Sequence, residues 1–233
     1  MREHRIRALA LDFDGTIRST DRPVEKGLLL KLVSLRDSGI KLILVTGRCL
    51  VDLRVLIDVS IFDAVVLENG AILLIGDRKA NLAPPGWDSV RLRLRRLFPR
   101  GHEEVIISLP REMEGEVLTR VGKSARIELN KDSLMILPPR VSKGSGLLMA
   151  LKELRVTKNQ VMCIGDAEND LAMFRVAHLK IAVRNSTPIL KREADYVTQK
   201  DDGKGVSEAI ERFIEEGGPP RKADKGQDSR HSR

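Results

Sequence analysis

The stretch ALALDFDGT at residues 8–16 joins a short apolar run to two aspartates that are one residue apart. Such a run is typical of a strand that is buried on both faces of a parallel sheet. On an extended chain, side chains two positions apart point the same way, so Asp12 and Asp14 should face one place. Gly15 lets backbone N–H groups approach an anion closely. The stretch therefore predicts a buried strand that carries two carboxylates to one site.

Four further apolar runs have a similar length and lie at residues 42–45, 64–67, 161–164 and 181–183. Between the runs, apolar residues recur at helical spacing, over 24–35 and again over 147–154. Strands that alternate with helices indicate an α/β fold. We expect a Rossmann-like, doubly wound parallel sheet.

The pattern changes between Gly70 and Arg140. Residues 126–130 alternate polar with apolar, and a turn at 130–132 leads into a second strand at 133–137, which indicates a one-sided antiparallel sheet. Helices are expected near 87–98 and 111–121. We therefore expect an inserted α+β cap at 81–140 and a core formed by residues 1–80 and 141–216.

Composition limits the class of partner. The 233 residues include 41 basic and 33 acidic side chains, a net charge of +8, and part of this excess lies in residues 217–233, which we predict to be a disordered basic tail. An aromatic content of 3% offers few stacking platforms for bases. The charge suits small anionic molecules as readily as nucleic acid and does not by itself settle the partner, while the few aromatic residues make nucleic acid the less expected of the two. Monomer and homodimer both remain open.

The chain shows no export or membrane signal. No apolar run approaches the ~20 residues that a membrane helix needs, and the N-terminus lacks the apolar region of a signal peptide. Cys49 and Cys163 lie far apart and form no CxxC pair, so we expect two buried thiols rather than a metal knuckle or a disulfide. These features predict a cytoplasmic protein.

Three more motifs follow predicted strands or open a helix. TGR at 46–48 follows the second strand, and KG at 143–144 opens the helix after the insert. GDAEND at 165–170 places another acidic cluster at the end of the fourth strand. Because ligands of open α/β sheets bind beyond the carboxyl ends of the strands, TGR and GDAEND should lie at the same edge as Asp12 and Asp14. Taken alone, Thr-Gly is also a common turn, and a lone lysine at a helix start is usually solvated.

Taken in order, DFDGT, TGR, KG and GDAEND resemble the four motifs of the haloacid dehalogenase superfamily, over residues 7 to about 214. The insert, with ENGA at 68–71 just before it, is similar to the C2-type cap of the Cof-like branch. The short insert and the chain length most resemble archaeal-type phosphoglycolate phosphatases. Sucrose-phosphate and mannosyl-phosphoglycerate phosphatases are relatives.

The resemblance implies covalent catalysis, in which one hard displacement becomes two easier ones. Asp12 is the implied nucleophile, while Asp14 protonates the leaving oxygen and then activates water. Thr46 and Lys143 are implied to bind the phosphoryl oxygens. The other residues expected to bind phosphate or substrate are Gly15, Gly47, Arg48, Asn69 and Asn169.

The resemblance also implies Mg²⁺, held by Asp12, the backbone carbonyl of Asp14, and Asp166. Asn169 and Asp170 would complete or orient this set. Mg²⁺ prefers hard carboxylate oxygens, and several like charges at one sheet edge are costly unless a cation lies among them.

We therefore expect a Mg²⁺-dependent phosphatase for a small phosphorylated metabolite of carbohydrate metabolism, with 2-phosphoglycolate first. Open alternatives are a sugar-phosphate phosphatase, a phosphotransferase or phosphomutase that uses the same aspartyl-phosphate, and a non-catalytic binding protein on this scaffold. We expect the basic segment 91–96 to form a solvated face of its helix. The alternative hypothesis is that its arginines attract an anionic substrate. The resemblance implies that the cap opens and closes on hinges at 71–84 and 138–142.

Overall fold

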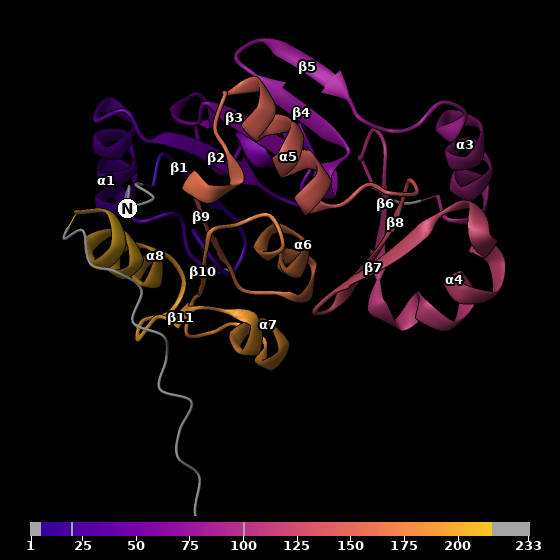
Figure 1. The fold of residues 1–233 in the computed structure, drawn as a ribbon. Coiled ribbons are helices and arrows are strands. Elements are labelled where there is room, and N and C mark those ends of the chain that lie inside the picture. The colour runs from indigo at the N-terminus through magenta and orange to yellow at the C-terminus, as the bar shows by residue number, and fades with distance from the viewer. Residues whose placement is uncertain (1–5, 20, 100, 216–233) are drawn as a thin grey trace, which may run out of the picture.

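The computed structural model describes residues 6–19, 21–99 and 101–215 of the chain (Figure 1). The predicted basic tail, residues 217–233, lies outside the described residues. Two sheets organise the rest, one of eight strands and one of three. The large sheet contains β1 (Ala8–Leu11), β2 (Lys41–Val45), β3 (Ala64–Leu67), β4 (Ile72–Ile75), β5 (Arg78–Asn81), β9 (Val161–Gly165), β10 (Leu179–Ala182) and β11 (Tyr196–Val197), and the small sheet contains β6 (Ile107–Pro110), β7 (Arg126–Asn130) and β8 (Ser133–Leu137).

Helices cover both faces of the large sheet and one face of the small one (Figure 1). The helices are α1 (Lys26–Asp37), α2 (Leu50–Arg54), α3 (Trp87–Leu97), α4 (Glu114–Val121), α5 (Lys143–Glu153), α6 (Leu171–Phe174), α7 (Pro188–Glu193) and α8 (Asp202–Ile210). Within the described residues, none of the helices is long and apolar enough to cross a membrane.

The large sheet has the strand order β11-β10-β9-β1-β2-β3-β4-β5. Every pairing from β11 to β3 is parallel, which confirms the expected Rossmann-like α/β fold. The chain moves from β1 outward through β2 to β3, and later returns to β9 on the other side of β1. β1 and β9 therefore flank the point where the strand order reverses, and in open α/β sheets the ligand binds at this point.

The edge beside β3 differs from the expectation. β4 and β5 are antiparallel and extend the large sheet, so most of the segment expected to be the first hinge, 71–84, is paired within that sheet. The four residues of β5, RKAN, are all exposed. This strand carries no apolar pattern, and only its backbone pairing with β4 identifies it.

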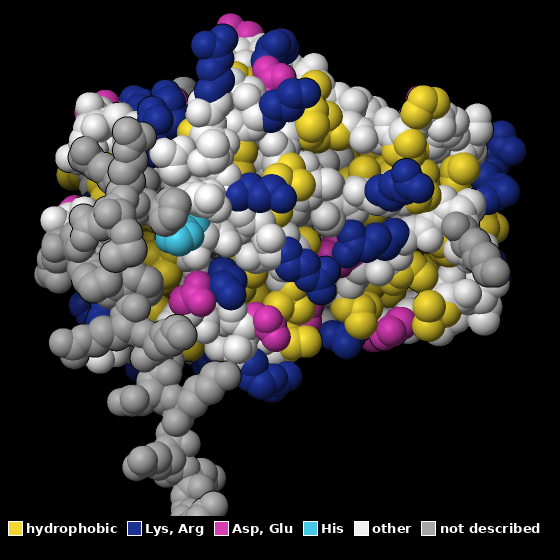
Figure 2. Space-filling view, viewed as in Figure 1, with side chains coloured by type: hydrophobic (Ala, Val, Ile, Leu, Met, Phe, Trp, Pro, Cys, Tyr) yellow, Lys and Arg dark blue, Asp and Glu magenta, His cyan; other side chains and the backbone are white. Residues whose placement is uncertain are grey.

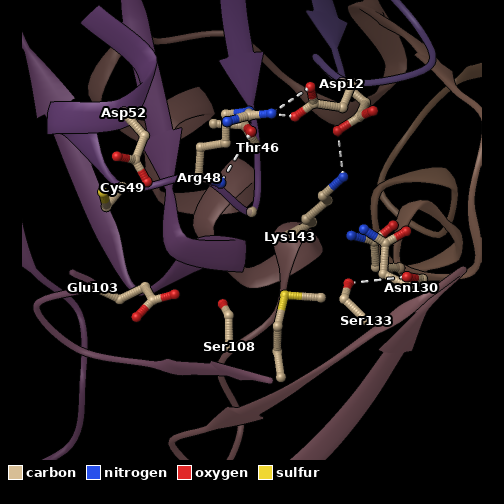
Figure 3. Close-up of a pocket in the computed structure, with 14 residues that line it drawn as sticks. Asp12, Thr46, Arg48, Cys49, Asp52, Glu103, Ser108, Asn130, Ser133 and Lys143 are labelled. Carbon is tan, nitrogen blue, oxygen red and sulfur yellow. Dashed lines mark hydrogen bonds and ion pairs between the residues drawn. The ribbon is translucent and has the colours of Figure 1, made fainter. Parts of the chain in front are cut away.

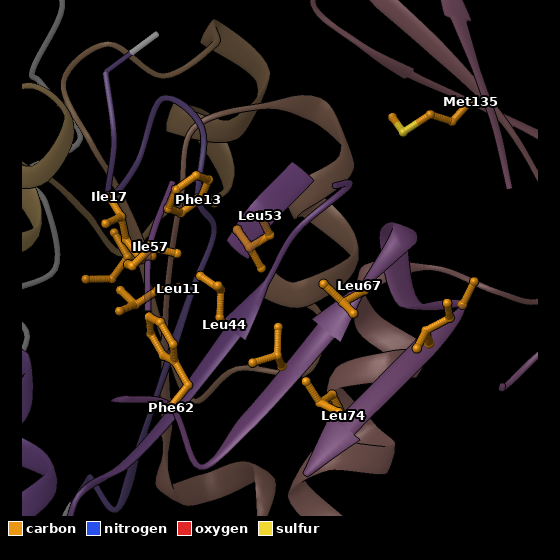
Figure 4. Close-up of a cluster of buried hydrophobic side chains, with 14 of the residues drawn as sticks. Leu11, Phe13, Ile17, Leu44, Leu53, Ile57, Phe62, Leu67, Leu74 and Met135 are labelled. Carbon is orange, nitrogen blue, oxygen red and sulfur yellow. The ribbon is translucent and has the colours of Figure 1, made fainter. Parts of the chain in front are cut away.

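Alternate residues of the buried strands supply two separate apolar layers. Leu9 and Leu11 of β1 pack in the layer that includes α1, α2 and α8, whereas Ala8 and Ala10 pack in the layer with α5, α6 and α7. Figure 4 shows side chains of the first layer, among them Leu11, Leu44 and Leu67, on one side of the strands. Burial on both faces explains why these strands appear as uninterrupted apolar runs.

The small sheet has one apolar and one mostly polar face. Leu109 of β6 and Leu134 of β8 are paired and buried in the cluster that also holds Leu94 of α3 and Val117 of α4. Ser108 and Met135, also paired, alternate with them and line a cavity on the opposite side. The helices α3 and α4 thus close one face, and the other is turned to the large sheet.

Candidate active site

Asp12 follows β1 directly and is buried. Its Oδ1 accepts a hydrogen bond of 2.5 Å from Nζ of Lys143, the first residue of α5. The same Nζ donates to Asp170 Oδ1 at 2.6 Å. Lys143 is also buried, so one ammonium group holds two carboxylates that come from sequence positions far apart.

The acidic motif after β9 is equally well ordered by hydrogen bonds. Asp166 Oδ1 accepts from the hydroxyl of Thr16 at 2.9 Å. Asp170 Oδ2 accepts the backbone N–H groups of Asp166 and Ala167 at 2.8 and 3.0 Å. Asp170 therefore fixes the loop and Lys143, because both of its oxygens are engaged.

Asp12, Asp166 and Asp170 each offer an oxygen that lies within 4.8 Å of the others. Burial is the largest cause that raises the pKa of Asp12 and of Asp166, and repulsion from Asp170 adds to it for both. Buried like charges with hard oxygen donors fit a divalent cation, which would lower this repulsion. Oxygens of Asp12, Asp166 and Asp170 could together hold such an ion.

Asp14, two residues after Asp12, lines the same cavity but is partly exposed. Arg48 donates two hydrogen bonds to Asp14, from Nε to Oδ2 at 2.6 Å and from Nη2 to Oδ1 at 2.9 Å. A two-bond pairing of arginine with a carboxylate is strong and directional. The same fork also suits phosphate oxygens, so Arg48 has two possible partners in this site.

Two glycines of this site are closely packed, one against a carboxylate and one against an amide. Gly15 has a φ of +79°, and a Cβ there would lie 2.4 Å from Asp166 Oδ2. A Cβ on Gly47 would lie 3.3 Å from Asn69 Oδ1. Thr46 is buried after β2, and its Oγ1 accepts the backbone N–H of Arg48 at 3.1 Å.

The cavity lies between the two sheets and has a volume of about 230 Å³. Figure 3 shows Lys143 pointing toward Asp12 from the core side, while Ser108, Asn130 and Ser133 lie on strands of the small sheet across from them. Asn169 is buried at its edge, and its Oδ1 finds no hydrogen-bond partner among the described residues. The cavity thus combines charged groups from the core with neutral polar groups from the insert.

Asn69 links the core to the insert at this cavity. Its Oδ1 accepts from Asn169 Nδ2 at 3.2 Å, and its Nδ2 donates to Met135 Sδ. Asn69 has a φ of 53°, a left-handed conformation that only a few per cent of non-glycine residues adopt. Asparagine adopts this conformation more readily than most residues, and the two amide hydrogen bonds orient its side chain here.

Glu68 makes a second link. Its buried carboxylate accepts three backbone N–H groups of the insert, from Glu104 at 2.7 Å, Val105 at 2.8 Å and Ile106 at 3.0 Å. Burial raises the pKa of Glu68, and the three N–H groups oppose this rise. A core side chain therefore anchors the incoming strand of the insert.

Lys131 makes the third link and was not among the predicted site residues. It lies in the turn between β7 and β8, and its Nζ donates to Asp166 Oδ2.

Thr16 and Glu68 were also not predicted as site residues, although both lie within motifs quoted above. No local pattern marks their roles, since each depends on a partner far along the chain. The predicted site residues that line this cavity are Asp12, Asp14, Thr46, Gly47, Arg48, Lys143 and Asn169, whereas Gly15, Asn69, Asp166 and Asp170 are not among its lining residues.

The basic segment of α3 is not simply solvated. Arg95 Nη2 donates to Glu103 at both its backbone oxygen and Oε2, at 3.1 and 3.0 Å, and Arg91 Nη2 donates to the same backbone oxygen. These two arginines therefore fix the segment that carries Glu103 beside the cavity. In Figure 2, Lys and Arg side chains are spread over the face shown, with acidic and hydrophobic side chains between them.

The sequence that forms this sheet and its acidic cluster matches a known protein family. The pattern of the haloacid dehalogenase-like hydrolases matches residues 9–82 and 103–210. The chain belongs to this family of hydrolases.

Known relatives narrow the class further. The chain is 34% identical to phosphoglycolate phosphatase 2 of Saccharolobus solfataricus over 218 residues. This alignment covers 88% of this chain and 91% of the relative. It is 32% identical to the phosphoglycolate phosphatase of Methanothermobacter thermautotrophicus, over 90% and 99% of the two chains. Together with the family, these matches show that the protein is an enzyme with phosphatase activity.

Solved structures support the fold. A haloalkanoate-superfamily phosphatase of Bacteroides thetaiotaomicron has a TM-score of 0.75 at 23% identity and covers 90% of this chain and 96% of its own. A Thermoplasma acidophilum protein has a TM-score of 0.75 at 20% identity, over 89% and 98% of the two chains. At these identities the similarity concerns the fold alone.

Proposed function

We propose that this enzyme hydrolyses 2-phosphoglycolate with Mg²⁺, through a phosphoryl group carried on Asp12. The observation that supports this most directly is the placement of the Asp12 carboxylate. It is buried at the end of β1, its Oδ1 is 2.5 Å from Lys143 Nζ, and it lies within the acidic group that includes Asp166. A carboxylate held in this way is oriented for attack on a phosphorus atom.

In the first step, an Asp12 oxygen bonds to phosphorus while the bond from phosphorus to the ester oxygen breaks. Asp14 donates a proton to that oxygen as it leaves. Arg48 is hydrogen-bonded to both oxygens of Asp14, so Arg48 must turn to the phosphoryl oxygens before Asp14 can reach the leaving oxygen. Thr46 and Lys143 bind the same oxygens from the core side.

In the second step, Asp14 accepts a proton from water, and the water oxygen bonds to phosphorus. The bond to Asp12 then breaks, which releases phosphate and restores both carboxylates. Asp12 and Asp166 would hold a divalent ion, whose positive charge would lower the repulsion between the nucleophile and the phosphate dianion. Asp170 and Thr16 hold Lys143 and Asp166 in position for it.

Residues 81–140 are proposed to act as a cap over the cavity. Their side chains Ser108, Asn130, Ser133 and Met135 form its far wall. Such a wall would exclude water and leave little room around the phosphate. Because 72–81 is paired in the large sheet, the hinges of this cap would lie at 82–86 and 138–142.

The size of the cavity supports a compact substrate. Its volume is about 230 Å³, below the ~300–1,000 Å³ that is common for drug-sized ligands. A two-carbon phosphoester suits this space better than a sugar phosphate does. The names of the two archaeal relatives point to the same substrate.

The test is phosphate release from 2-phosphoglycolate and a panel of sugar phosphates, with Mg²⁺ or EDTA, for wild type and Asp12→Asn. We expect Mg²⁺-dependent turnover that is highest for 2-phosphoglycolate and falls by about 10⁴-fold or more in the variant. Circular dichroism controls for folding. If Asp12→Asn kept its activity, the covalent role of Asp12 would be wrong. Transfer of phosphate to added glycerol in preference to water would favour a phosphotransferase instead.

A further inference from the structure

Lys131 brings a positive charge from the insert into the core site. Its Nζ donates to Asp166 Oδ2, and a Cβ built on Gly15 would lie 3.0 Å from that nitrogen. Its backbone N–H also lies 3.4 Å from Glu168 Oε2. The mechanism above uses Lys143 and assigns nothing to Lys131.

The backbone at Lys131 is unusual for a lysine. Asn130 pairs with Ser133, so Lys131 and Asp132 form a two-residue hairpin loop. Lys131 has a φ of 49°, a conformation for which such loops use Gly, Asn or Asp. A bulky side chain kept in an unfavourable conformation points to a function for that side chain.

Charge balance explains what this ammonium does beside Asp166. The three buried carboxylates carry three negative charges, and Lys143 and Lys131 together balance two of them. A divalent ion with Lys143 alone would balance all three. It would also repel Lys131, whose charge would then be free for another anion.

We propose that Lys131 determines specificity by binding a second acid group of the substrate, the carboxylate of 2-phosphoglycolate, once a divalent ion replaces it at Asp166. This inference rests on the proposed function. The ammonium is bonded to Asp166 and interacts with Asp12, a cavity residue, so rotation of its own side chain would bring it to the substrate. The two other cations that line the cavity, Arg48 and Lys143, bind the phosphoryl oxygens in the proposed mechanism.

The first test compares two substrates of similar size, 2-phosphoglycolate and 2-hydroxyethyl phosphate, which lacks the carboxylate. In Lys131→Asn, the ratio of kcat/KM for the acidic over the neutral substrate should fall about 10- to 100-fold, the effect of one lost hydrogen bond to a charged group. Asn suits the left-handed turn, so the hairpin should fold. Lys131→Arg should restore most of the ratio.

The matched control is Arg120→Gln, which removes an exposed cation of the same insert that pairs with Glu116 at 3.4 Å on its own helix. Its substrate ratio should equal that of wild type. A ratio in Lys131→Asn within about twofold of wild type overturns the proposal, as does an equal fall in Arg120→Gln.

The second test titrates metal-free protein with Mg²⁺ by calorimetry, without substrate. Lys131→Asn should bind Mg²⁺ several-fold more tightly than wild type, because no ammonium competes for Asp166. An unchanged or weaker affinity overturns the displacement of Lys131 by metal, and with it the proposal. If wild type hydrolyses no phosphoester, the proposed function fails, and this titration still decides whether Lys131 and the metal compete.

Discussion

Glu128 is a buried acidic residue of the small sheet. The side chain is buried on β7, on the face of the small sheet that holds Met135. One oxygen accepts from Arg126 Nη2 at 3.0 Å, and the other finds no hydrogen-bond partner among the described residues. Burial raises the pKa of Glu128 above its ordinary value of 4.5, while Arg126 and Lys143 oppose the rise.

This raised pKa predicts a pH-dependent gain in stability for Glu128→Gln. The folded state holds the proton of Glu128 more tightly than the unfolded state does, so ionisation costs stability. The cost is absent below pH 4.5, grows as the pH rises through the raised pKa, and is then constant. The free energy of unfolding of the variant, relative to wild type, should therefore rise with pH.

Urea denaturation at a series of pH values between about 4 and 8 measures this difference. Glu112→Gln, on an exposed side chain of the insert, controls for the loss of one charge. A relative stability of Glu128→Gln that falls with rising pH would show that Arg126 outweighs burial.

Single residues also show what the sequence could predict of the site. Asp12 and Asp166 could be predicted because each directly follows a buried strand, where parallel strands expose their ends to a ligand. Lys131 could not, since it reaches Asp166, 35 residues away, only because of how the insert packs on the core. A turn sequence carries no information about that packing.

At the scale of elements, two Lys-Gly pairs open two helices in different surroundings. In α5, a Cβ on Gly144 would lie 2.2 Å from the backbone oxygen of Ala172, whereas a Cβ on Gly27 of α1 would meet nothing within 4 Å. Ala is favoured over Gly inside helices by about 1 kcal/mol. At Gly144 the packing therefore opposes the helix propensity of alanine, whereas at Gly27 the propensity acts alone.

We expect Gly144→Ala to lower the free energy of unfolding by about 1–3 kcal/mol, because the clash with α6 outweighs helix propensity. It should also lower kcat, since the shift of α5 displaces Lys143 from Asp12. Gly27→Ala should leave kcat unchanged and raise stability by up to about 1 kcal/mol. Thermal unfolding and turnover of both variants decide this, and equal effects at the two sites would refute it.

Elements were predictable where burial leaves a pattern. β1, β2, β3 and β9 were recognised as apolar runs because helices cover both of their faces. β10 begins two residues earlier than expected, since Lys180 interrupts its run. β5 was missed because an exposed edge strand needs only backbone pairing and shows no apolar pattern.

At the scale of the whole molecule, the cavity exists only where the two sheets meet. Its core wall comes from the ends of strands in the large sheet, and its opposite wall from β6, β7 and β8. Met135 lies on that opposite wall, and a Cβ on Gly47 would approach its sulfur to 3.5 Å. The side chain of Met135 therefore limits the space in the cavity beside Gly47.

Met135→Ala should widen the range of substrates. The ratio of kcat/KM for glucose 6-phosphate over 2-phosphoglycolate should rise by at least about tenfold, which is the scale of one or two methylene groups in a pocket. The loss of buried volume should also cost about 2–5 kcal/mol of stability. Leu134→Ala is the matched control, because Leu134 is buried on the same strand but faces α3 and α4. It should cost similar stability and leave the ratio unchanged, whereas an equal change of the ratio in both variants would mean that looser packing, and not the room left by Met135, admits the larger substrate.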